Sequence, residues 1–229
     1  MPAQIQELIE SADNFEIVRD KIAAILLLEQ ADQQAKALAA LPPKDPRLWA
    51  LRIFTERSNP WAEFQDTPDQ IDATPIVNIS VDQGTYDERA SNVVERQKGE
   101  FVYNIDCYGY GVSAADGAGH IPGDAKAALE SHRAFRLVRK ILMSSYYTYL
   151  DLRGTVWKRF PQSFHVFQPK DDTRPTEHVV GVRLKLEVHM NEFSPQVQGE
   201  TLEELNVEVK RGETGEIFFV ETFVVPPPP

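Results

Sequence analysis

The sequence predicts an α+β fold: a mixed, largely antiparallel β-sheet with two main helices packed on it and with extended loops or a hairpin arm. Two stretches with apolar residues at helical spacing, 14–41 and 124–150, predict the helices. Six or seven stretches of alternating or continuous apolar residues predict the strands. Strands dominate the second half and do not alternate with helices, so a doubly wound nucleotide-binding sheet is not expected.

Length and composition predict a single soluble α+β domain over residues 1–229, retained in a cytoplasm. The chain is 42% hydrophobic and 26% charged, and no apolar run approaches the roughly 18 residues of a membrane span. The acidic N-terminus lacks the order of a signal peptide, and the single cysteine excludes an internal disulfide framework. The net charge of −11 disfavours a protein whose main task is to grip phosphate backbones.

The first predicted helix covers residues 14–41 and is capped by Asp13 or Asn14, with Glu16 in its first turn. The prolines in 41–46 end it, because proline cannot continue a helix. Its predicted apolar stripe consists of Ile17, Ile22, Ile25, Leu28 and Leu38.

The following region, 42–74, is expected to be a proline-rich insertion or loop. Within it, 47–60 is apolar on both faces and favours a buried strand over a short helix, and 59–75 is expected to be a loop. Residues 75–82 predict a strand, whereas the polar stretch 83–99 is either a long hairpin arm or a flexible loop.

The middle of the chain predicts a strand, a glycine-rich loop and the second helix. In strand 100–111, one face holds Phe101, Tyr103, Ile105 and Cys107, and loop 112–123 follows. Asp124 is the expected N-cap of helix 124–150. The predicted core face of this helix consists of Leu129, Val138, Ile141 and Leu142.

The second half predicts four more strands. Strand 154–169 is expected to be broken or bulged at Pro161. Strand 178–190 alternates most clearly: its even positions from Val180 to Met190 are apolar, and its water-facing residues are Arg183, Lys185, Glu187 and His189. Shorter strands are expected at 202–210 and 215–225, before the polyproline tail 226–229.

The segment Gly109-Tyr110-Gly111 has part of the spacing of a dinucleotide-binding fingerprint, but its context is wrong. The glycines of such a fingerprint open the helix that holds the pyrophosphate, whereas Gly109 lies 15 residues before Asp124. Cys107 falls on an apolar strand face, which predicts a buried, inert thiol. A nucleophilic role would require a base such as His120, and no residue pattern brings the two together.

The histidines indicate no strong metal site. His165 and His189 both fall in predicted strands and could be neighbours across a sheet, although a satisfied or exposed sheet histidine is the simpler interpretation. The remaining histidines are His120, His132 and His178, and no HxH or HxxxH pair occurs. No catalytic residue, cofactor or metal is predicted, and the protein is not expected to be an enzyme.

The charges are uneven along the chain. Helix 124–150 carries a basic stripe, whereas the stretches from Glu63 to Glu100 and from Glu187 to Glu221 are strongly acidic. Such asymmetry suits subunits that meet acidic face to basic face, and solvated surfaces with local ion pairs are an equal alternative. The stripe consists of Arg133, Arg136, Arg139 and Lys140.

The order of elements resembles that of the tail terminator (tail completion) proteins of bacteriophages, above all those of contractile-tailed phages. The matching segments are "FEIVRDKIAAILL", "PIVNISVD", "FVYNIDCYGYG", "ESHRAFRLVRKILMS", and "VVGVRLKLEVHMNEFSP" followed by "LEELNVEVK". The resemblance covers 14–27 and 75–210, and it rests on the pattern of elements rather than on a catalytic signature.

The resemblance implies a structural virion protein that forms a six-fold ring at the head-proximal end of the tail. Such a ring caps the tail tube, ends its polymerisation and provides the attachment surface for the neck connector, and in contractile tails it can also hold the last sheath ring. Implied partners are further copies of the chain and the tube, sheath and neck proteins. DNA would pass through the lumen without specific binding, and assembly would take place in the bacterial cytoplasm without a membrane.

Six charged residues are candidates for the contact between subunits in such a ring: Arg133, Arg136, Lys140, Arg183, Lys185 and Glu187. Two alternatives remain open. The chain could be another neck or tail component, such as a connector, tube or head-completion protein. It could also be a small cytoplasmic enzyme with a site in the 107–123 loop.

Overall fold

The structure is a computed structural model that describes residues 10–64, 74–87, 96–116, 119–169, 177–193, 204–210 and 217–224. The helical segments are α1 (Asn14–Ala39), α2 (Gly123–Leu142) and the short 3-10 helices η1 (Pro46–Trp49), η2 (Pro60–Phe64) and η4 (Ser145–Tyr147). The strands are β1 (Arg52–Thr55), β2 (Ile76–Tyr86), β3 (Arg96–Val112), β4 (Ala114–Asp116), β5 (Gly119–Ile121), β6 (Val156–Phe167), β7 (Glu177–Phe193), β8 (Glu204–Lys210) and β9 (Ile217–Val224).

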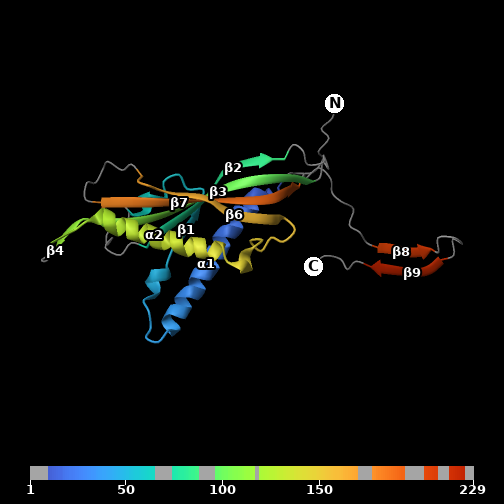
Figure 1. The fold of residues 1–229 in the computed structure, drawn as a ribbon, viewed down its shortest axis with the longest axis horizontal. Helices are drawn as coiled ribbons and strands as arrows, with labels where there is room; N and C mark the ends of the chain where they lie inside the picture. The colour runs from blue at the N-terminus through green and yellow to red at the C-terminus, as the bar shows by residue number, and fades with distance from the viewer. Residues whose placement is uncertain are drawn as a thin grey trace, which may run out of the picture. The chain divides into compact units, whose positions relative to one another are not determined.

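The chain divides into two compact units. The larger, residues 6–194, contains both α-helices and a five-stranded sheet in the order β1-β2-β3-β7-β6 (Figure 1). The smaller contains the separate hairpin of β8 with β9. The predicted α+β class is therefore confirmed, as are the two strands expected at 202–210 and 215–225. Neither described α-helix is long and apolar enough to cross a membrane.

The five-stranded sheet is mixed, with one parallel pair. β1 runs parallel to β2, and the other neighbours are antiparallel. Both ends of the stretch 83–99 belong to paired strands, since β2 and β3 pair as far as Tyr86 and Gly99, and this pairing favours the hairpin arm. Residues 88–95 lie outside the described residues. β6 shifts register between Pro161 and Ser163, as the expected bulge requires.

One face of the sheet carries the main hydrophobic core, and both α-helices pack on it. The alternation predicted for β3 is confirmed, since Phe101, Tyr103, Ile105 and Cys107 all belong to this core. The register pairs Cys107 with Val182 and Ile105 with Leu184, so the apolar residues of β7 extend the same face. Burying each such aliphatic side chain stabilises the fold by about 1.5–3 kcal/mol.

Helix α1 begins as predicted, but its buried stripe differs from the expected one. The Asp13 N–H donates to Glu16 Oε2 at 3.1 Å. Val18, Ile22, Ile25 and Leu26 are buried against the sheet and α2. The prediction was wrong for three residues that are exposed: Ile17, Leu28 and Leu38. Leu28 and Leu38 are exposed because the C-terminal half of α1 extends beyond the sheet (Figure 1).

The N-terminus of α1 is held by a buried carboxylate from β7. Glu192 accepts hydrogen bonds from the backbone N–H groups of Asn14, at 2.9 Å, and Phe15, at 2.7 Å. Although these donors favour the carboxylate, burial dominates and raises the pKa of Glu192 above its ordinary value. The folded protein therefore retains this proton at pH values at which the unfolded chain has lost it.

The raised pKa of Glu192 predicts a loss of stability as pH rises. Because the native state binds the proton more tightly, the free energy of unfolding should fall from about pH 4.5, the ordinary Glu value, up to the native pKa. Glu192→Gln should lack this contribution, which urea unfolding at several pH values would measure. Asp124→Asn, which changes an exposed residue of α2, is the control. A constant difference between Glu192→Gln and wild type across this range would contradict the prediction.

Helix α2 begins at Gly123, with Pro122 as N-cap, so the expected cap at Asp124 was wrong by two residues. The predicted span to residue 150 was also too long, because α2 ends at Leu142 and η4 follows. Val138, Ile141 and Leu142 are buried as expected. Leu129 is 70% exposed instead, since Ala127, Ser131 and Ala134 form the face against the sheet.

The glycines of β3 let α2 approach the sheet closely. A Cβ on Gly109 would lie 2.1 Å from the Ala127 carbonyl oxygen, and one on Gly111 would lie 2.1 Å from that of Gly123. Both glycines lie inside β3, in agreement with the predicted strand 100–111. The predicted loop 112–123 instead contains the short strands β4 and β5.

The stretch 47–60, expected to be one buried strand, is mostly not a strand. Pro46 opens η1, where the Asp45 carboxylate accepts the Arg47 N–H at 3.0 Å. Only β1, four residues long, pairs with the sheet, and Pro60 opens η2. Proline pre-sets the backbone for a helical turn, and this local preference prevails over the apolar pattern. The rest of the insertion, 65–73, and the polyproline tail lie outside the described residues.

Candidate functional site

The sheet face opposite the α-helices carries an ordered set of charged residues. We call it the polar sheet face and define it by Asp82, Asn104, Asp106, Arg183 and Lys185. Asp106 and Arg183 lie directly opposite each other on β3 and β7. The Arg183 guanidinium donates to both Asp106 oxygens, at 2.6 and 2.7 Å. Lys185 Nζ donates to Asp82 Oδ2 at 2.8 Å, and the Asn104 amide donates to Asp82 Oδ1 at 2.9 Å.

These contacts perturb the ionisation of the polar sheet face in defined directions. The hydrogen bond from Lys185 lowers the pKa of Asp82. The hydrogen bond to Asp106 raises the pKa of Arg183, so the guanidinium stays charged over the whole physiological range. The charges of the polar sheet face are thus paired with one another within the chain.

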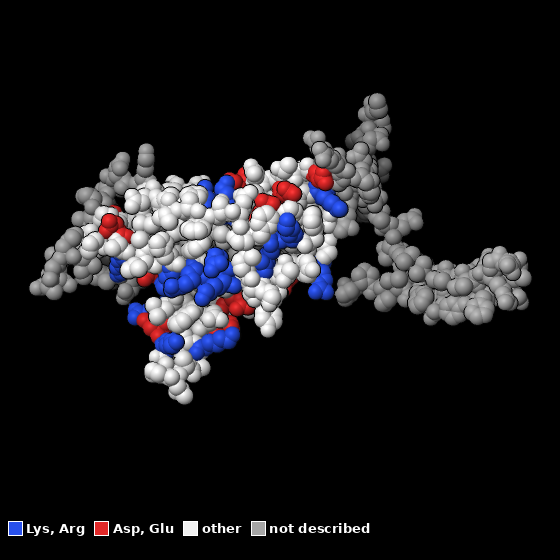
Figure 2. All heavy atoms as spheres, viewed as in Figure 1, with Lys and Arg blue, Asp and Glu red and all other residues white. Residues whose placement is uncertain are grey.

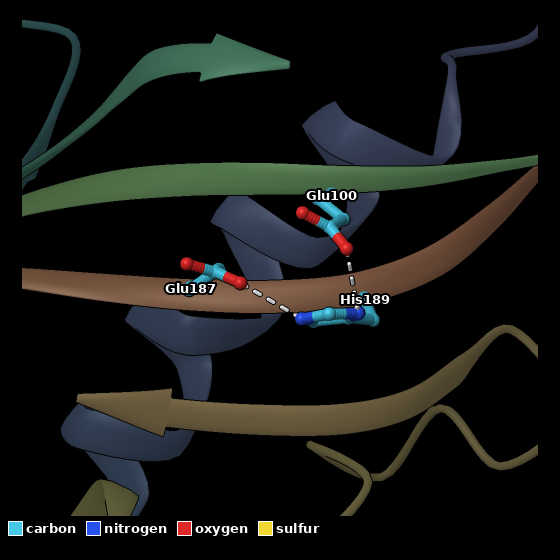
Figure 3. A group of neighbouring side chains, drawn as sticks. All are labelled: Glu100, Glu187 and His189. Atoms are coloured by element: carbon cyan, nitrogen blue, oxygen red, sulfur yellow. Dashed lines mark hydrogen bonds and ion pairs between the residues drawn. The ribbon is translucent and has the colours of Figure 1, made fainter. Parts of the chain in front are cut away.

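A second group of charged residues lies farther along β3 and β7. Glu100 on β3 pairs in register with His189 on β7, two residues from Glu187 (Figure 3). His189 Nε2 lies 2.8 Å from Glu187 Oε1, and Nδ1 lies 3.5 Å from Glu100 Oε1. His189 is 6% exposed and stands beside the Trp157 and Phe160 rings. Among the described residues, these three side chains are the group with the spacing of metal ligands.

His165 and His189, which were considered as neighbours across a sheet, do not pair. In the register of β6 with β7, His165 lies opposite Arg183 and His189 lies opposite Lys158. The six-residue offset along β7 corresponds to about 20 Å. The structure instead brings His189 to two carboxylates, a combination that depends on the register of β3 with β7.

A groove of about 690 Å³ runs between α1 and α2, and we call it the α1–α2 groove. Acids of α1 line one side and bases of α2 line the other, in a mixed acidic and basic surface. At its floor, the Tyr147 hydroxyl donates to Glu29 Oε1 at 2.5 Å, which raises the pKa of Tyr147 to about 12. Its charged lining residues are Glu29, Asp32, Lys36, Arg133, Arg136 and Lys140.

The six charged residues predicted at a subunit contact fall on two separate surfaces. Arg183 and Lys185 belong to the polar sheet face, and Glu187 bonds to His189 and to Gln162. The other three lie on α2, on the opposite side of the sheet: Arg133, Arg136 and Lys140.

The basic residues of α2 differ in their availability to a partner. Arg133 bonds to Glu130 and to the Arg47 and Leu48 carbonyl oxygens. Arg136 and Lys140 form no ion pair within the part of the chain that the structure describes. Figure 2 shows Lys and Arg side chains gathered over α2. Of the six predicted contact residues, Arg136 and Lys140 are therefore the free charges.

Cys107 is a buried thiol of the core, as predicted. It is fully buried between the sheet and the helices, and burial raises its pKa far above the ordinary value. The side chain of His120, the base considered for it, lies outside the described residues. This environment does not favour nucleophilic chemistry at the 107–123 loop.

The burial of Cys107 predicts that the thiol reacts only after the protein unfolds. Ellman's reagent should label the native protein more slowly than a free thiol by several orders of magnitude, since both access and the thiolate are suppressed. In 6 M guanidinium chloride, labelling should reach one thiol per chain, the number in the sequence. Rapid labelling of the native protein would show that Cys107 is accessible.

Sequence reasoning placed Asp106 and Asn104 on the face of β3 opposite the core but assigned them no role. It also assigned no role to Asp82 and Glu100, which are the last residue of the predicted strand 75–82 and the first residue of the predicted strand 100–111. A signal existed in the alternation of strand 178–190, whose basic positions required acidic partners on a neighbouring strand. No protein-family model matches the chain, and a search of the curated proteins finds no match.

Proposed function

We propose that this protein is a structural virion subunit that assembles into a hexameric ring and acts as a phage tail terminator. In this role it caps the tail tube, ends tube polymerisation and presents the surface to which the neck connector attaches. The assignment to a phage tail rests on the order of elements in the sequence. The ring assembly is supported by one observation: among the described residues, two sheets end in strands that lack a partner on one side.

The first of these strands is β6, the edge of the five-stranded sheet. It is 12 residues long and exposes large apolar side chains, among them Trp157, Phe164 and Val166. A long edge strand offers unpaired N–H and C=O groups to another chain. Natural monomers cover or charge such edges, so an exposed apolar one favours subunit pairing.

The second sheet is the hairpin of β8 with β9, which forms a compact unit distinct from residues 6–194. A two-stranded hairpin is at best marginally stable alone in water. We infer that it gains stability by adding to an edge of a neighbouring subunit. A donor hairpin and an acceptor edge on each chain make a heterologous contact, which closes into a ring when the rotation allows.

The charges support the same assembly. Arg136 and Lys140 on α2 can meet an acidic neighbour, and the net charge of −11 suits a ring whose lumen lets DNA slide rather than adhere. Contacts with the tube, sheath and neck proteins belong to this proposal. The burial of Cys107 gives no support to the alternative of an enzyme.

Ring formation should depend on the β6 edge. Val166→Lys is expected to weaken subunit association by about tenfold, or about 1.4 kcal/mol, because it places a charge on the pairing edge. Val166 is 53% exposed, so the fold should persist. Native mass spectrometry would compare the six-copy assembly of the 25.9-kDa chain in both proteins. Leu28→Lys, at an exposed position on α1, is the matched control.

The tail-terminator assignment is tested with tail tubes. The full chain should bind one end of assembled tubes in negative-stain images and should stop their elongation when it is added during assembly. Assembly on the tube end satisfies the proposal even for a chain that is monomeric alone. Absence of the protein from tube ends, with elongation unaffected, would refute the assignment.

A further inference from the structure

We propose that Glu100 and His189 form a binding site for a divalent transition-metal ion of the zinc class, with Glu187 as the residue that positions the imidazole. The two proposed ligands face each other across adjacent strands, since Glu100 of β3 pairs in register with His189 of β7 (Figure 3). A site on two paired strands of the central sheet is held by the backbone ladder rather than by a loop. This site is independent of the proposed role in a tail.

The first observation is the unsatisfied nitrogen of His189. The residue is only 6% exposed, and its Nδ1 atom is buried and makes no hydrogen bond. Buried polar atoms in proteins are nearly always bonded, so an orphan of this kind requires an explanation. Nδ1 points toward Glu100, whose Oε1 lies 3.5 Å away (Figure 3).

The separation of these two atoms fits a metal ion better than a direct hydrogen bond. A nitrogen and an oxygen that each lie about 2.1 Å from a tetrahedral zinc ion are about 3.4 Å apart. The 3.5 Å between His189 Nδ1 and Glu100 Oε1 matches this separation between two ligands of one ion, whereas the donor–acceptor distances of N–H···O hydrogen bonds cluster near 2.9 Å.

Glu187 determines which nitrogen of the His189 imidazole carries the proton. Its Oε1 lies 2.8 Å from His189 Nε2, so in the neutral ring the Nε2–H donates to the carboxylate and Nδ1 carries the free lone pair. Metal-binding histidines commonly donate their second N–H to a carboxylate in this way, which orients the ring and raises its basicity. Glu187 is therefore a positioning residue and not a ligand.

The proposed site is shielded by aromatic rings on one side and open to solvent on the other. The rings of Trp157 and Phe160 lie 5.0 and 5.8 Å from the His189 ring and shield it. The Glu100 side chain is 60% exposed and lines a hollow of about 420 Å³ that Trp157 also lines. A cation can thus enter from this side, with water completing its coordination. Imidazole and carboxylate ligands favour zinc, copper or nickel over magnesium or calcium.

The test is a calorimetric titration of the full-length, metal-free protein with ZnCl₂. Wild type is expected to bind one ion per chain. His189→Gln and Glu100→Gln should each weaken binding by at least about tenfold, and Glu187→Gln by about 10- to 100-fold. Glu100→Gln changes an exposed side chain, so it tests the site without endangering the fold. Asp124→Asn, an exposed acid on α2, should bind zinc as wild type does.

Two spectroscopic signals locate the ion. Saturating Cu²⁺ should quench the fluorescence of Trp157, and the quenching should be largely lost in Trp157→Phe. In ¹⁵N spectra of the histidines, Zn²⁺ should shift Nδ1 of His189 while Nε2 keeps its proton. The proposal is overturned by non-saturable binding, by unchanged affinity in Glu100→Gln and His189→Gln, or by coordination through Nε2, each of which means that Nδ1 and Glu100 do not hold the ion.

Discussion

Gly109→Ala is expected to destabilise the α+β unit by about 3 kcal/mol, because the added methyl group overpacks the contact between β3 and α2. Its Cβ would lie 2.1 Å from the Ala127 carbonyl oxygen and 2.4 Å from the Ser131 nitrogen. Both atoms belong to the backbone of α2, so the whole helix must move to relieve the clash. Urea unfolding followed by circular dichroism measures the loss.

Gly154→Ala is the matched control for this prediction. Gly154 has a positive φ of 99° but open space around its Cβ position, so alanine there carries a conformational cost of about 1–2 kcal/mol and no clash. The packing argument requires the Gly109 variant to be the less stable of the two. The reverse order would mean that α2 shifts easily on the sheet.

Arg183→Met is expected to cost about 3 kcal/mol, because it leaves the Asp106 carboxylate charged and buried without its partner. Asp106 has a side chain that is 4% exposed and would keep only the hydrogen bond from the Tyr108 hydroxyl, at 3.1 Å. The double variant Asp106→Leu/Arg183→Met should recover much of the loss, since it removes the buried charge as well. Urea unfolding of the two variants and wild type measures both effects.

Lys185→Met provides the comparison on the same strand. Lys185 and Asp82 are both about a third exposed, so water can replace the lost contact and the expected cost is about 1 kcal/mol or less. If both single variants lose the same stability, the burial of Asp106 is not what makes its ion pair strong.

Arg183 and Lys185 each form an ion pair within the chain, which changes the interpretation of the charges on β7. Alternation in the sequence correctly placed these residues on the side away from the core. Their partners, Asp106 and Asp82, come from other strands. Charges satisfied within one chain contribute little to attraction between chains, so β6 and α2 are the better candidates for subunit contacts.

Much of the fold followed from local patterns. The α+β class, both α-helices and the strands of the second half were predictable because alternation and helical spacing report directly on which side chains are buried. The exact set of buried residues on the helices was less predictable. Leu28 and Leu129 have the spacing of core residues but remain exposed, because the sheet ends before it reaches Leu28 and because small residues of α2 form the contact near Leu129.

The two faces of β3 and β7, the burial of Cys107 and the bulge near Pro161 were predictable from local patterns, since each depends on neighbours along the chain. Three features required the three-dimensional structure: the close approach of α2 to Gly109 and Gly111, the ion pair of Asp106 with Arg183, and the contact of His189 with Glu100. The physical reason is register: a shift of one residue between β3 and β7 would replace every one of these cross-strand pairs while leaving the sequence pattern of each strand unchanged.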